Sequence, residues 1–174
     1  MTRFTRHQIW FHWLSLLLIA TAYAAIELKG IVPKTTPWHD YLKIIHFNAG
    51  CFVLVLMCIR LYFQRNQVTP EIIPTPPQWQ LTLSKAIHYI MYAAFILLPL
   101  LGLIMLAVGG KQWDLVGISI PAFSVPDKAT SKSIKEIHET IADIGYFLIA
   151  LHAGAAIYHH YVVKDNTLQR MLPK

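Results

Sequence analysis

The stretch IKEIHETIADIGYFLIALHAGAAIYHHYVV, residues 134–163, decides the fold class of this 174-residue chain. Its last 23 residues, Ile141–Val163, are apolar apart from one aspartate and three histidines. A helix of that length is about 35 Å long, which is enough to cross a hydrocarbon core of about 30 Å. Because a lipid-exposed backbone must satisfy its own hydrogen bonds, we expect this stretch to be a transmembrane helix.

Three similar stretches precede it, at Ile9–Ile26, Ile44–Phe63 and Ala86–Val108. Hydrophobic residues make up 55% of the chain and charged residues only 14%, against about a quarter charged in soluble domains. This composition excludes an ordinary soluble protein and predicts an all-α, integral membrane, antiparallel four-helix bundle. We expect one membrane domain over residues 1–174, with helices at about 8–28, 40–64, 82–108 and 134–163.

The first apolar stretch has an alternative interpretation as a secretory signal peptide. Arg3 and Arg6 precede it, and the small-residue cluster AYAA lies near its end, as at a cleavage site. A transmembrane helix is favoured because the apolar part is long, contains His12 between aromatic neighbours, and is followed by three more such stretches.

The net charge of +6 comes from charges that flank the apolar stretches, with no dense basic tract. This pattern indicates anchoring at membrane edges and no nucleic-acid partner. The side that holds both termini has eight basic residues: Arg3, Arg6, Arg60, Arg65, Lys85, Lys164, Arg170 and Lys174. The other side has seven: Lys29, Lys34, Lys43, Lys111, Lys128, Lys132 and Lys135. Since all five arginines lie on the terminal side, we expect both termini in the cytoplasm.

Histidines within the apolar stretches are the most informative residues, because ionisable groups in a membrane are costly and commonly functional. His138 and His152 are 14 residues apart, which places them on one helix face about 21 Å apart along the axis. Gly145 lies between them and leaves space there. This arrangement predicts two flat macrocycles side by side in the membrane.

Depth in the membrane suggests the partners of these two histidines. In an antiparallel bundle, His46 lies on the same side as His138, so these two form a natural axial pair. His12 belongs to the opposite side, with His152 and His159. His152 is expected to lie deeper in the membrane than His12, so depth slightly favours His159 as the partner of His12. The spacing along the sequence does not decide between His152 and His159.

Three segments together resemble the bacterial cytochrome b561 family: HETIADIGYFLIALHAGAAIYHHYVVKDNTLQRMLP at 138–173, FHW near the start, and IIHFNAG in the second helix. The resemblance implies two haem b groups in a bacterial inner membrane, one held by His12 and His152 and one by His46 and His138. One member type is a superoxide oxidase that passes electrons to ubiquinone, and the family also resembles cytochrome subunits of hydrogenases and formate dehydrogenases.

Two histidine ligands leave no open position on iron, so such haems are expected to carry single electrons. Superoxide is a small anion whose encounter rate basic side chains would raise. The outer side carries such lysines: Lys29, Lys34, Lys111, Lys128, Lys132 and Lys135. Acidic residues are interspersed among them, so ordinary solvated loop charges explain the lysines equally well.

Ubiquinone as acceptor needs a hydrogen-bond partner and a proton source. His88, His159 and His160 are candidates because imidazole titrates near neutrality. Arg60, 14 residues after His46, could pair with a haem propionate or reach the lipid headgroups. We take Asn48, Tyr92 and Pro99 as packing residues.

Two other functions stay open at this point. The chain could be a non-catalytic electron-transfer subunit that docks a redox partner protein through the loop Gly109–Lys132. It could also be a membrane scaffold without any cofactor, which would be colourless.

Overall fold

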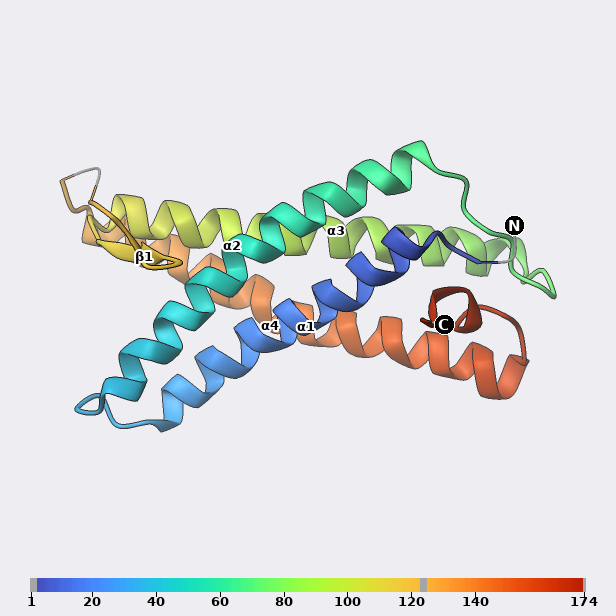
Figure 1. The fold of residues 1–174 in the computed structure, drawn as a ribbon, viewed down its shortest axis with the longest axis horizontal. Helices are drawn as coiled ribbons and strands as arrows, with labels where there is room; N and C mark the ends of the chain where they lie inside the picture. The colour runs from blue at the N-terminus through green and yellow to red at the C-terminus, as the bar shows by residue number, and fades with distance from the viewer. Residues whose placement is uncertain (1–2, 123–124, 174) are drawn as a thin grey trace.

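The computed structural model describes residues 3–122 and 125–173 of the chain. Four long helices dominate it: α1 (Arg6–Ile31), α2 (Pro37–Asn66), α3 (Gln78–Val108) and α4 (Lys128–Tyr158). All four are long and apolar enough to cross a membrane. Figure 1 shows them running back and forth along the long axis of the molecule, with both chain ends and the α2–α3 link at the right-hand end of the bundle. The prediction of an all-α four-helix membrane bundle is confirmed; Lys174, counted above among the terminal-side charges, lies outside the described residues.

The helices extend beyond their apolar stretches because polar residues cap them further out. α1 begins after Thr5, whose hydroxyl accepts a hydrogen bond from the Gln8 amide while the Gln8 side chain accepts one from the Thr5 amide, which is a capping box. α4 begins at Lys128, about six residues before the start at about 134 that the sequence predicted. It begins there because the Asp127 carboxylate caps the helix and accepts a hydrogen bond from the Thr130 amide at 3.0 Å. Capped polar turns therefore carry the helices past the apolar core of the bilayer.

The bundle is built from two helical hairpins. The backbones of α1 and α2 lie close together, as do those of α3 and α4, and α2 joins the two hairpins through α3. The buried core between them is small: Ile19, Val53, Met57, Phe95 and Leu98. Large apolar side chains such as Phe147, which is 77% exposed, cover the outside, as expected of a surface that faces lipid.

The loop between α3 and α4 contains a hairpin that the sequence did not predict. β1 (Trp113–Leu115) pairs antiparallel with β2 (Ile118–Ile120), and the turn places Val116 and Gly117 at positive φ, 50° and 82°. This backbone is unfavourable for a β-branched residue. Asn48 of α2 supports it, since its side chain donates to the Asp114 carbonyl and accepts from the Val116 amide at 2.8 Å. Asn48 is therefore a tether for the hairpin, beyond the packing role we had given it.

The end of the chain folds back over the terminal side of the bundle. α4 continues as a π-helical turn, His159–Val163, and Lys164 then reverses the chain with a φ of 60°. The C-terminal segment that follows, residues 164–173, includes the short 3-10 helix Gln169–Met171. The Trp13 indole donates to the Met171 carbonyl at 2.8 Å, and the buried Arg170 side chain donates to the Pro70 carbonyl. The segment thus joins α1, the α2–α3 link and α4 (Figure 1).

Candidate functional site

The first pair of histidines joins α2 to α4 on the side of the hairpin. The ring centres of His46 and His138 are 6.3 Å apart and their planes are inclined by 73°. His46 Nδ1 lies 2.8 Å from the Ala22 carbonyl oxygen. Because a carbonyl only accepts, Nδ1 carries the ring proton and Nε2 keeps a lone pair. His138 Nδ1 is buried without a hydrogen-bond partner.

The second pair joins α1 to α4 on the terminal side. The ring centres of His12 and His152 are 6.1 Å apart, with planes inclined by 62°. Of the two partners that depth had left open for His12, the fold brings His152 to it. His159 lies in the π-helical turn and forms its close contact with Asp165 of the C-terminal segment.

The spacing of both pairs can be compared with that of imidazoles on a haem. A metal-bound imidazole nitrogen lies about 2 Å from its metal, so two rings on opposite faces of one iron have centres about 6 Å apart. Both observed separations match this value. Gly102 of α3 borders the first pair, and a Cβ there would make an ordinary contact, 3.6 Å from His138 Cε1. The residues present fit two haem groups.

A third imidazole stands beside the second pair. His88 of α3 has its ring centre 5.2 Å from that of His152, with nearly perpendicular planes. Its Nδ1 donates to the Ser84 carbonyl at 2.6 Å, so its Nε2 also keeps a lone pair. His88 therefore contacts His152 of the second pair, and its role as a quinone candidate, like those of His159 and His160, stays a prediction.

Arg60 lies inside the bundle against the second pair. Its Nη2 is 3.1 Å from His12 Nδ1, and its guanidinium carbon is 5.6 Å from the Tyr92 ring centre. Arginine only donates, so in this arrangement His12 Nδ1 accepts and the ring proton is on Nε2. Binding iron through Nε2 requires the opposite tautomer. In that tautomer His12 Nδ1 donates and can no longer accept from Arg60. The Arg60 guanidinium would then be available to pair with an anion.

The space between the two pairs is filled by protein, which corrects our interpretation of Gly145. A Cβ on Gly145 would collide with the Tyr23 hydroxyl of α1, which donates to the Ala142 carbonyl at 2.8 Å. The Phe95 ring, 2% exposed, lies on the same spot. Gly145 thus makes room for Tyr23, and these aromatic side chains separate the two histidine pairs.

A carboxylate that sequence reasoning missed lies beside the quinone candidates. Asp165 Oδ2 is 2.6 Å from His159 Nδ1, and Oδ1 accepts from the Thr167 amide at 2.8 Å. Burial acts to raise the pKa of Asp165, but the hydrogen bonds from His159 and Thr167 outweigh it and hold this pKa below its ordinary value. In the sequence, Asp165 ends the run HHYVVKD and is six residues after His159. Only the chain reversal at Lys164 brings the two side chains together, so the sequence alone did not identify Asp165. His160 Nδ1 is buried without a partner, and its ring centre is 4.7 Å from that of Tyr161.

The lysines expected to steer superoxide are partly paired. Lys135 lies 2.5 Å from Glu139 and Lys132 lies 3.8 Å from Glu136, both as exposed pairs one turn apart. Such pairs reduce the net positive field of the first turns of α4.

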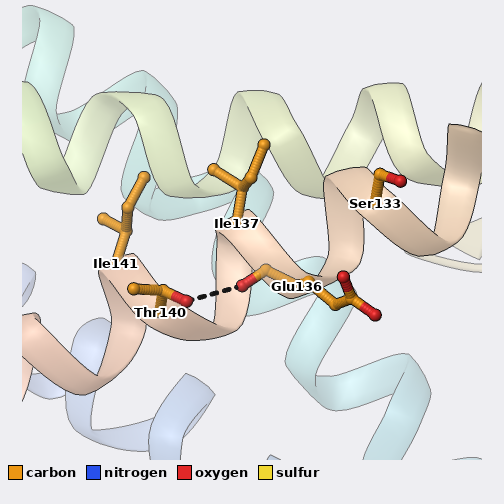
Figure 2. A pocket seen from close by; sticks show the side chains of 5 residues that line it. All are labelled: Ser133, Glu136, Ile137, Thr140 and Ile141. Carbon is orange, nitrogen blue, oxygen red and sulfur yellow. Dashed lines mark hydrogen bonds between the residues drawn. The ribbon is translucent and has the colours of Figure 1, made fainter.

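A surface hollow beside these residues belongs to the outside of the bundle. Figure 2 shows its lining on α4, with Ile137 and Ile141 turned toward α3 and Glu136 turned away. Ser133 and Thr140 complete it. None of the paired histidines lines this hollow, so it has no part in the candidate site.

The amino-acid sequence is similar to a known protein family and to individual bacterial proteins. The profile of the prokaryotic cytochrome b561 family matches residues 3–174. "Cytochrome b561 homolog 1" of Escherichia coli K12 is 47% identical over 174 residues, covering 100% of this chain and 99% of the relative. "Probable superoxide oxidase CybB" of Yersinia pestis is 41% identical over 168 residues, covering 96% of this chain and 94% of the relative.

Proposed function

Because the chain belongs to the prokaryotic cytochrome b561 family, a family of membrane cytochromes that bind haem b, we propose that it is a superoxide oxidase that reduces ubiquinone. The observation that carries the proposal is the presence of two histidine pairs at separate depths, each with ring centres about 6 Å apart. The name of the Yersinia pestis relative supports superoxide as the donor.

His46 and His138 hold one haem b and His12 and His152 the other. When bound, the two groups supply single-electron transfer between the two faces of the membrane. Ala22 holds His46 with Nε2 available, and Gly102 of α3 lies against the His138 ring. Arg60, whose Nη2 is 3.1 Å from His12 Nδ1, would supply a positive charge beside this haem and would be the partner for one of its propionates.

The overall reaction balances with the two substrates. Two superoxide anions each lose one electron and become O₂, while one ubiquinone takes up two electrons and two protons and becomes ubiquinol. Lysines on the side of the hairpin raise the encounter rate of superoxide. On the terminal side, His159 supplies protons to ubiquinone, and His160 is a second candidate. His88, which contacts His152, is better placed to support the second pair.

The chain forms a single membrane domain in the bacterial inner membrane with both termini in the cytoplasm. The five arginines on the terminal side support this orientation. A C-terminal reporter that is active only in the cytoplasm should be active; an inactive reporter would reverse the orientation.

The first prediction concerns purified, haem-loaded protein in liposomes. Superoxide should reduce its haem absorbance at a rate near the diffusion limit, and added ubiquinone should reoxidise it with formation of ubiquinol. Superoxide dismutase is the control that should abolish both changes. His46→Ala and His138→Ala should each remove one haem of two and leave the other. Slow reduction by superoxide at low salt would refute the proposal.

A second function is favoured by one observation on the hairpin. Val116 and Ile118 are 69% and 66% exposed there, as they would be on a docking surface for a redox partner protein. A non-catalytic electron-transfer subunit would show slow reduction by superoxide and rapid reduction by that partner.

A further inference from the structure

The chain reversal after α4 brings an acidic side chain back onto a histidine. Lys164 has a φ of 60°, and the Asp165 amide donates to the His159 carbonyl at 3.1 Å. The Asp165 side chain is fully shielded from solvent, while that of His159 is 17% exposed. The backbone therefore fixes Asp165 against the ring independently of the side-chain contact.

Both oxygens of this carboxylate are used. Oδ2 lies 2.6 Å from His159 Nδ1, and Oδ1 accepts from the Thr167 amide at 2.8 Å. A carboxylate only accepts, so the proton on His159 must be at Nδ1. Within the described part of the chain, Nε2 of His159 makes no hydrogen bond, which leaves it available to a ligand.

We propose that Asp165 is a positioning residue that holds His159 in the tautomer with Nδ1 protonated and presents Nε2 to the ubiquinone oxygen. This inference rests on the proposed function, since it assigns the proton path of the same site. Buried partners of this kind orient imidazoles in other sites and set which nitrogen reacts.

The proton balance follows from this geometry. The Nδ1 proton stays on His159, where it is hydrogen-bonded to Asp165, while Nε2 takes a proton from the aqueous phase and gives it to a ubiquinone oxygen. Two such proton transfers, one for each electron, deliver the two protons that ubiquinol carries. Two basic residues lie near Asp165: Lys164, which directly precedes it, and Arg170, whose guanidinium donates to the Pro70 carbonyl.

The second prediction tests Asp165→Asn in the haem-loaded protein. Asparagine keeps an oxygen for the Thr167 amide but can turn an NH₂ group toward His159 Nδ1, which favours the opposite tautomer. We expect reoxidation by ubiquinone to slow by about tenfold or more, with a changed pH profile, while reduction by superoxide without quinone is unchanged. Asp127→Asn is the matched control, because Asp127 also caps a backbone amide but at the opposite end of α4; it should leave reoxidation by ubiquinone unchanged.

Two further measurements separate a positioning role from a merely structural one. In the His159→Gln background, Asp165→Asn should have no added effect on quinone reduction; an equal slowing there would overturn the proposal. Nitrogen NMR of ¹⁵N-histidine protein should show His159 protonated at Nδ1 in the wild type and at Nε2 in Asp165→Asn. A wild-type ring protonated at Nε2 would also overturn it. Failure of the wild type to reduce quinone would refute the proposed function, and the NMR result would still decide the role of Asp165.

Discussion

At the scale of single residues, hydrogen bonds to Nδ1 distinguish the histidines. His46 donates to the Ala22 carbonyl and His88 to the Ser84 carbonyl, so both keep a lone pair on Nε2. His12 accepts from Arg60 and has the opposite tautomer. A single hydrogen-bond partner therefore decides whether an imidazole is ready to bind iron or must first release its neighbour.

The third prediction concerns the charge of Arg60. A guanidinium close to an iron site stabilises the reduced form, which carries one more negative charge. Arg60→Gln should therefore lower the midpoint potential of the haem that we propose for His12 and His152, as measured by spectroscopic redox titration, and leave the other proposed haem unchanged. Arg65→Gln, an exposed arginine on the same helix, is the control. Equal shifts of both haems would contradict this assignment.

At the scale of elements, small residues set how closely the helices approach. Gly102 lets α3 lie against the His138 ring, and Gly145 lets Tyr23 of α1 reach the α4 backbone. Gly50 of α2 faces Pro99 of α3, with 4.0 Å between the built Cβ and the proline Cβ. These three glycines thus lie at helix contacts, as is common in membranes.

The fourth prediction compares two substitutions of Gly102. A Cβ would lie 3.6 Å from His138 Cε1, which is an ordinary contact, so Gly102→Ala should keep two haems per chain. Gly102→Leu should displace the ring and lose the haem that we propose for His46 and His138. The control is Gly154→Leu on α4, where a Cβ would meet nothing within 4 Å. The haem-to-protein ratio measures the outcome, and full haem content in Gly102→Leu would show that His138 is not confined by α3.

At the scale of the whole molecule, the C-terminal segment closes the terminal end of the bundle. Its contacts reach Trp13, Phe4, Pro70 and Ile73, so they join α1, the α2–α3 link and α4. Few other polar groups are as buried as its Asp165 and Arg170, which are 2% and 7% exposed. We therefore expect the fold of the segment to depend on the charge of Asp165.

The fifth prediction follows from the lowered pKa of Asp165. The folded protein binds fewer protons at this group than the unfolded chain, so its stabilising contribution is present above the unfolded pKa of about 4 and is lost as pH falls through the folded pKa. We expect the C-terminal segment to loosen below about pH 4. Hydrogen exchange at the Thr167 amide, corrected for intrinsic rates, should speed up between pH 5 and pH 3. In Asp165→Asn this dependence should disappear; an identical dependence in the variant would contradict the role of the carboxylate.

The sequence by itself determined the four membrane helices, because apolar length is a local property that lipid turns into structure. Helical periodicity likewise determined that His138 and His152 share a face of one helix. The tertiary structure decided which rings meet: His12 and His88 both reach His152, Arg60 contacts His12, and Tyr23 fills the space at Gly145. It also decided that Asp165 returns to His159. These contacts depend on helix rotation, tilt and one chain reversal, and no spacing along the sequence encodes any of the three.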